Sequence, residues 1–83
     1  MTAKTLRKAT GLSQIKLAKV FGLKSYKVAT GQEVSSTWNN WERNGTPLKI
    51  ETDSFNSADI CKLVMEASDR GTTLAKLIGE KLS

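Results

Sequence analysis

Apolar side chains recur every three or four residues in five separate stretches of the chain, with polar side chains between them. This spacing is that of an amphipathic α-helix, which turns one face toward a protein core. A serine, threonine or asparagine precedes each stretch and can cap its first turn, and a glycine follows four of them. The pattern therefore predicts an all-α fold of five short helices, which with their caps cover about residues 2–10, 13–21, 35–43, 56–68 and 72–82. The cap of the third helix is expected at Ser35 or Ser36, that of the fourth at Asn56 or Ser57, and that of the fifth at Thr72 or Thr73.

The apolar positions of these helices predict the core. In chain order the expected inward side chains are Leu6 and Ala9; Ile15, Leu17, Ala18, Val20 and Phe21; Val34, Trp38 and Trp41; Ile60, Leu63, Val64 and Ala67; and Leu74, Leu77, Ile78 and Leu82. Residues 69–71 are predicted as a turn and residues 48–55 as a linker or an irregular turn. Because 83 residues do not accommodate two cores, we expect one domain over residues 1–83.

Residues 24–33 interrupt the helical period between the second and third helices. This segment contains the β-formers Tyr26 and Val28 and a turn signal at Thr30-Gly31. We therefore expect a loop or a short hairpin here.

The chain lacks the residues on which most enzymes and metal sites depend. It contains no histidine, which excludes histidine-based acid–base catalysis and most zinc sites. Its single cysteine, Cys61, cannot form an intramolecular disulfide and is predicted to be a buried structural thiol. We expect no catalytic residue, metal, cofactor or small-molecule ligand. No apolar run is long enough for a membrane span or a secretory signal, so the expected location is the cytoplasm, without a membrane partner.

The net charge of +5 is distributed unevenly. Residues 1–32 carry seven basic and no acidic side chains, whereas the rest of the chain carries six basic and all eight acidic ones. This asymmetry favours an oriented encounter with a polyanion, of which nucleic acid is the most common. The alternative interpretation is a solvated basic face without a partner.

The third predicted helix has two faces of different chemistry. Val34, Trp38 and Trp41 share one face, which is large and apolar, and the tryptophans are expected in the core. Asparagine and arginine side chains pair with adenine and guanine edges, and serine suits a base or a phosphate. The alternative is that the polar face only meets water, although serine and asparagine are poor helix formers. The polar face consists of Ser36, Asn39, Asn40 and Arg43.

Residues 6–23, LRKATGLSQIKLAKVFGL, resemble the first two helices of the Cro/cI-type (XRE) helix-turn-helix family. Residues 35–47, SSTWNNWERNGTP, resemble that family's recognition helix and its exit. The matching features are the Leu12-Ser13-Gln14 helix start, Leu17-Ala18, Gly22, the Trp41-Glu42 pair, and Gly45 with Pro47. The resemblance implies a lambda-repressor-like fold.

The resemblance also implies roles for single residues. Ser36, Asn39, Asn40 and Arg43 fall where family members contact bases, and Gln14 falls where a glutamine meets the phosphate backbone. Glu42 is expected to be a structural partner of a basic side chain of the first helix, such as Arg7. The further expected contacts to the DNA backbone are Lys16, Lys24, Tyr26, Lys27 and Ser35.

The connection between the second and third helices departs from the family pattern. Ten residues separate Leu23 from Val34, whereas the usual turn has about 3–4. Two interpretations are open for this insertion. It forms a basic flap that contacts the phosphate backbone through Lys24, Tyr26 and Lys27, or it is a surface loop that the fold tolerates.

By resemblance, the chain is expected to be a transcription regulator, specifically a repressor of phages or other mobile elements. Small members of the family bind inverted-repeat operators in double-stranded DNA as homodimers. Leu77, Ile78 and Leu82 are candidate dimer contacts, and a plain core role for them is an equal alternative. Three other functions stay open: an antitoxin, an excisionase-like architectural factor, and a protein-interaction module that does not bind DNA.

Overall fold

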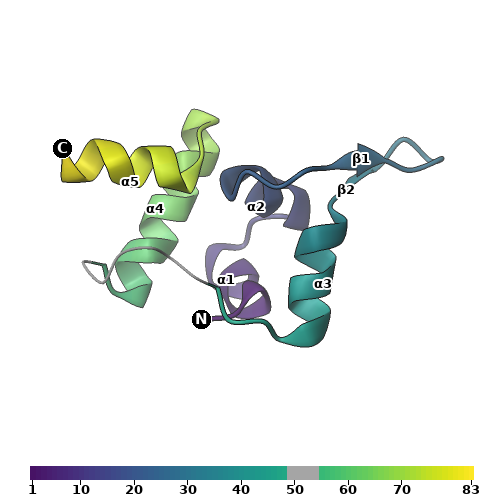
Figure 1. The fold of residues 1–83 in the computed structure, drawn as a ribbon, viewed down its shortest axis with the longest axis horizontal. Helices are drawn as coiled ribbons and strands as arrows, with labels where there is room; N and C mark the ends of the chain where they lie inside the picture. The colour runs from purple at the N-terminus through teal and green to yellow at the C-terminus, as the bar shows by residue number, and fades with distance from the viewer. Residues whose placement is uncertain (49–54) are drawn as a thin grey trace.

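Five helices and one short hairpin form the regular structure of the computed structural model, which describes residues 1–48 and 55–83. The protein is mostly helical, as predicted, and Figure 1 shows the hairpin extending beyond the helices at the same end of the molecule as α3. In chain order the elements are α1 (Ala3–Thr10), α2 (Gln14–Val20), β1 (Tyr26–Lys27), β2 (Glu33–Val34), α3 (Ser36–Asn44), α4 (Ser57–Arg70) and α5 (Leu74–Leu82).

The helix boundaries follow from capping side chains that the sequence predicts. Thr2, Ser13, Ser35, Asn56 and Thr73 each accept a hydrogen bond from the backbone N–H three residues further on. α2 ends one residue earlier than expected, at Val20. The predicted turn at residues 69–71 is wrong, because α4 continues through Arg70 and stops only at Gly71, whose φ of 67° ends the helix. Within the predicted linker 48–55, residues 49–54 lie outside the described residues.

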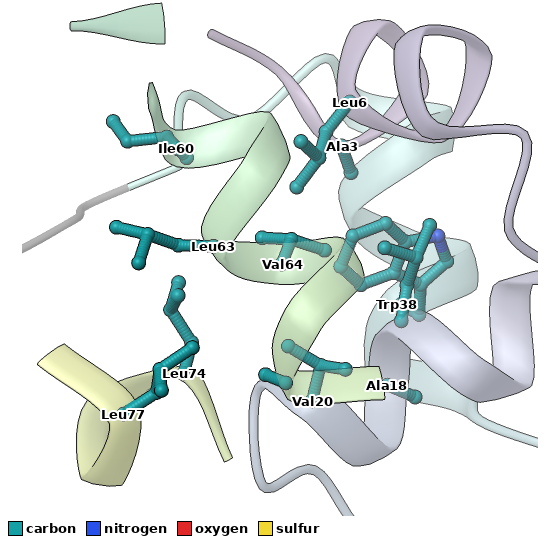
Figure 2. Close-up of a cluster of buried hydrophobic side chains, with 12 residues drawn as sticks. Ala3, Leu6, Ala18, Val20, Trp38, Ile60, Leu63, Val64, Leu74 and Leu77 are labelled. Atoms are coloured by element: carbon teal, nitrogen blue, oxygen red, sulfur yellow. The ribbon is translucent and has the colours of Figure 1, made fainter. Parts of the chain in front are cut away.

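One core joins all five helices. Figure 2 shows its side chains gathering from every helix, with the indole of Trp38 among them. α3 packs on α1 and α2, and α4 packs on α1, α2 and α5. Phe21 and Trp41 lie against Trp38, with ring centroids 5.5 and 5.7 Å away. Burial of Trp38 therefore fixes which side of α3 faces outward.

The inward face of α1 differs from the prediction. Ala9 is exposed, and Ala3, Leu6 and Thr10 are buried instead. These three residues are spaced three and four apart and so lie on one side of the helix. Thr10 is tolerated there because its hydroxyl donates to the carbonyl of Leu6 at 2.9 Å. Cys61 is only half-buried, at the edge of the core.

The interruption at residues 24–33 is a hairpin, one of the two predicted forms. β1 and β2 pair antiparallel, with Tyr26 opposite Val34 and Lys27 opposite Glu33. Gly31 takes a φ of 85° in the turn between them. The second strand runs directly into the cap of α3, so the hairpin is attached to the N-terminal end of that helix.

The segment after α3 returns to the start of the chain. Leu48 donates its backbone N–H to the carbonyl of Met1 at 2.8 Å, and Thr2 and Pro47 form an antiparallel bridge. This contact holds the C-terminal end of α3 beside α1. Across residues 1–48 and 55–83, none of the helices is both long and apolar enough to cross a membrane.

Candidate nucleic-acid interface

The outward side of α3 carries the polar residues that the sequence singles out. Ser36, Asn40 and Arg43 are exposed, and Asn39 is half-buried. Trp38 is fully buried on the opposite side. The spacing of Ser36, Asn40 and Arg43 is four and three residues, which places them in one row along the helix. We call these four polar residues the α3 edge.

A single carboxylate fixes α3 against α1 and α2. Glu42 accepts two hydrogen bonds from Nε of Arg7, at 2.9 and 3.1 Å, and a third from its Nη2 at 2.8 Å. Gln14 Nε2 donates to Glu42 Oε2 at 2.6 Å, and Trp38 Nε1 donates to the same oxygen at 2.8 Å. The expected pairing of Glu42 with Arg7 is confirmed. The two additional donors were not predicted.

The electrostatics of this cluster keep it ionised. Burial alone would raise the pKa of Glu42, but the hydrogen bonds from Arg7, Gln14 and Trp38, together with the charge of Arg7, lower it below the ordinary value. The hydrogen bond to Glu42 and the charge of that carboxylate raise the pKa of Arg7 in turn. Both groups are therefore charged at neutral pH. Because a forked guanidinium meets a carboxylate in a fixed geometry, the pair also sets the orientation of α3.

Gln14 is held at the first residue of α2, on the exposed side of the Glu42 cluster. Its amide group has two hydrogens, of which one is directed at Glu42. The other hydrogen has no acceptor among residues 1–48 and 55–83. The side chain is therefore positioned to donate to a further acceptor next to the N-terminus of α2.

The hairpin presents basic and aromatic side chains beside the α3 edge. Lys24, Tyr26 and Lys27 are exposed. The acidic residue of the hairpin, Glu33, accepts from Ser25 Oγ at 2.6 Å and pairs with Lys19 Nζ at 3.1 Å. These two hydrogen bonds, that of Ser25 foremost, lower the pKa of Glu33. The hairpin is thus tied to α2, and its one negative charge is matched by a lysine.

A direct link joins the hairpin to the α3 edge. The hydroxyl of Ser36 donates to the hydroxyl oxygen of Tyr26 at 3.1 Å. Ser36 is the first residue of α3, and Tyr26 lies opposite Val34 in the hairpin. No sequence signal pointed to this contact, because it depends on the register of the hairpin.

Lys16, an expected backbone contact, lines a groove between α2 and the turn that joins α4 to α5. The groove has a volume of about 620 Å³, and its wall includes Lys19 and Lys76. Sequence reasoning missed Lys76 as a neighbour of Lys16, because Lys76 comes from α5. Lys76 adds a cation from α5 to this groove, whose wall also includes Asp69, whereas Lys19 is paired with Glu33 of the hairpin.

Two expected contacts are buried and must be corrected. Ser35 is only 4% exposed, and its hydroxyl accepts from the backbone N–H of Trp38, so it serves as the cap of α3 rather than as a surface group. Leu77 is fully buried in the protein's own core, which removes it from the candidate dimer contacts. Ile78 is half-buried against the core, and Leu82, expected inside, is 60% exposed.

Comparisons of the chain with protein-family models, with curated proteins and with solved structures find no match. Among the described residues, no group of three or more histidine, cysteine, aspartate or glutamate side chains has a metal-binding arrangement.

Proposed function

We propose that this chain is a sequence-specific DNA-binding regulator of transcription, a repressor of the Cro/cI type, in which α2 and α3 act as a helix-turn-helix. The observation that carries the proposal is the two-sided α3. Its tryptophans anchor it in the core while Ser36, Asn39, Asn40 and Arg43 remain at the surface. The resemblance of residues 6–23 and 35–47 to that family supports the same assignment.

In this proposal α3 enters the major groove. Arg43 pairs with a guanine and Asn40 with an adenine, because their side chains match the hydrogen-bonding edges of those bases. Gln14 donates its second amide hydrogen to a phosphate. Glu42 contacts no base; its four hydrogen bonds from Arg7 and Gln14 hold α3 at a fixed angle to α1 and α2.

The phosphate backbone on either side of α3 meets the basic surface. Lys24, Tyr26 and Lys27 of the hairpin contact it at the N-terminal end of α3, and Lys16 contacts it from α2. Because Glu33 is already paired with Lys19, the hairpin approaches the DNA without an unmatched carboxylate. These contacts supply affinity and orientation, and the α3 edge supplies sequence preference.

We further propose a homodimer on an inverted repeat, with Ile78 and Leu82 as the apolar contacts. Figure 1 shows α3 and α5 at opposite ends of the molecule, whose long dimension is 42 Å. Such a dimer requires half-sites separated by one turn of DNA, about 34–36 Å, or by a multiple of it.

The test is a selection of bound duplexes from random DNA, followed by a mobility-shift titration of the selected duplex at low salt. The proposal expects retention of a defined site that contains an inverted repeat. Selected sites in tandem would point to an architectural, excisionase-like factor. Absence of retention at low salt would contradict DNA binding and favour a protein-interaction module.

A further inference from the structure

The excess positive charge of the fold belongs to α1, α2, the hairpin and α3. Residues 1–48 carry eight basic and two acidic side chains, whereas residues 55–83 carry four of each. The two acidic residues of the first part, Glu33 and Glu42, pair with Lys19 and Arg7. Every acidic side chain of residues 1–48 is thus already matched by a cation, and the other basic side chains there carry uncompensated charge.

Two of these uncompensated charges, Lys4 and Lys8, form a row on α1. They are four residues apart, so one lies a helical turn beyond the other on the same side of the helix. Both are exposed, and neither pairs with a carboxylate in the part of the chain that the structure describes. Like charges at this spacing repel each other and weaken a helix. A bound anion would relieve that repulsion.

Arg7 shows which side of α1 this row occupies. Its guanidinium reaches Glu42 in the last turn of α3, at 2.8 Å. Around the axis of a helix with 3.6 residues per turn, Arg7 lies between the buried Ala3 on one side and Lys4 and Lys8 on the other. The two lysines therefore occupy the solvent-exposed surface of α1 that borders α3.

The row on α1 and the hairpin lie at opposite ends of α3 (Figure 1). The bridge between Thr2 and Pro47 holds the start of α1 beside the C-terminal end of α3, whereas the hairpin, with Lys24 and Lys27, joins its N-terminal end. The nine residues of α3 span about 13.5 Å at 1.5 Å per residue. The major groove of DNA is about 12 Å wide. The distance between the two ends of α3 is therefore close to the width of the groove.

We infer that Lys4 and Lys8 form a second contact surface for DNA phosphates, at the C-terminal end of α3, so that the protein binds the backbones of both strands that border one major groove. This inference rests on the proposed DNA binding and adds α1 to the elements that contact the duplex. Lysine ammonium groups attract phosphates and read no base. The row on α1 therefore supplies affinity and helps to orient α3, and base preference stays with the α3 edge.

The first experiment measures the affinity of the full chain and its variants for the selected duplex between about 50 and 200 mM salt. Lys4→Ala and Lys8→Ala should each decrease the slope of log affinity against log salt concentration by about 0.9, which makes the loss of affinity over this range about 3.5-fold smaller. Lys4→Arg and Lys8→Arg keep the charge and should keep the slope. Lys62→Ala, in the charge-balanced part of the chain, should also keep it.

The second experiment locates the phosphates. Each phosphate of one half-site is replaced in turn by an uncharged methylphosphonate. A replacement at a phosphate that Lys8 contacts should weaken binding of the original chain and leave Lys8→Ala unaffected, and the same logic applies to Lys4. The phosphates assigned in this way to Lys4 and Lys8 should lie on the strand opposite to those assigned to Lys24 and Lys27.

Two results would overturn the inference while leaving DNA binding standing. They are an unchanged salt slope in either Lys4→Ala or Lys8→Ala, and assignment of the lysines of α1 to the same strand as those of the hairpin. Absence of binding by the original chain to any selected duplex would overturn the proposed function together with this inference. Because Lys4 and Lys8 are exposed, thermal unfolding of both alanine variants should match that of the original chain, which verifies that they are folded.

Discussion

Gln14 and Glu42 are joined by a hydrogen bond of 2.6 Å that links the first residue of α2 to the last turn of α3. The same carboxylate receives Arg7 from α1 and the indole of Trp38 from within α3. Three helices therefore meet at one side chain beneath the α3 edge. The angle between α2 and α3 is set by this cluster, and the long connection between the two helices does not need to set it.

Removal of this carboxylate should destabilise the fold. In Glu42→Ala, the buried Trp38 loses the acceptor for its indole N–H and Arg7 loses its ion-pair partner. We expect the free energy of unfolding in urea to fall by roughly 1–3 kcal/mol. The control is Glu80→Ala, which removes an exposed ion pair with Arg70 and should cost less than about 1 kcal/mol. Equal losses in the two variants would contradict a special role for Glu42.

Stability should also fall on acidification in a way that depends on Glu42. Its pKa is lower in the folded chain than in the unfolded chain, where a glutamate has a pKa of about 4.3. The stability that ionised Glu42 contributes is therefore complete above that unfolded value and is lost as the pH falls through the folded pKa. Urea unfolding between pH 3 and 7 should show a shallower acid-side loss in Glu42→Gln than in the original chain. The pKa of Glu33 is also lowered, but Glu33 is present in both proteins and therefore affects the two curves equally. Parallel curves would contradict the assignment.

Base reading by the α3 edge can be tested by truncation. Asn40→Ala and Arg43→Ala should each weaken binding to the selected site by about 1–3 kcal/mol and relax preference at one base pair, because a base contact is lost. Footprint titrations of the selected duplex and its single-base variants give both quantities. Lys62→Ala, an exposed residue of α4, is the control and should leave preference unchanged. Unaltered site preference in Arg43→Ala would show that the register proposed for α3 is wrong.

The hairpin lysines should behave differently from the α3 edge. Under the proposed function, Lys24→Ala and Lys27→Ala each remove a phosphate contact, so they should weaken specific and non-specific duplexes similarly. The slope of log affinity against log salt concentration should decrease by about 0.9 for each lysine. Titrations at several salt concentrations measure that slope, with Lys62→Ala again as the control. If the hairpin is only a surface loop that does not contact DNA, the slope will be the same in the two lysine variants as in the original chain.

Two glycines in the C-terminal half allow a test of the backbone that does not depend on function. Gly79 lies inside α5 and a Cβ added there would meet nothing within 4 Å, so Gly79→Ala should stabilise the chain by about 0.5–1 kcal/mol. Gly71 has equal space but a φ of 67°, so Gly71→Ala should destabilise it. Thermal unfolding of the two variants should shift in opposite directions; a shift in the same direction would contradict the end of α4 described above.

Local signals explain how much of this fold could be predicted. Thr2, Ser13 and Gly45 act within one helical turn, so the sequence alone indicates where α1, α2 and α3 begin or end. The two faces of α3 follow from the spacing of its tryptophans. The inward face of α1 was harder to predict because alanine has only a methyl side chain, which fits both a core and a surface. The sequence therefore did not show that Ala3 is buried and Ala9 is exposed. The length of α4 was underestimated because Asp69 and Arg70 are polar, although Arg70 extends the helix and pairs with Glu66.

Contacts between distant segments were beyond prediction for a physical reason. The contact between Ser36 and Tyr26 and the pair of Lys19 with Glu33 require the hairpin register, which no residue pattern fixed. Lys16 and Lys76 line the same groove only because α2 packs against the turn before α5. Similarly, only packing distinguishes buried Leu77 from exposed Leu82, since both continue the same helical stripe.

The closed base of the hairpin makes its tip independent of the helices. Because Tyr26 and Val34 are paired and Glu33 is tied to α2, the chain leaves and re-enters the body of the protein at fixed points. Residues 29–32 can therefore be lengthened, shortened or replaced by a fluorophore or a cleavage reagent while α3 keeps its place. If the proposed DNA binding holds, a probe attached at the tip will report which nucleotides lie beside the hairpin.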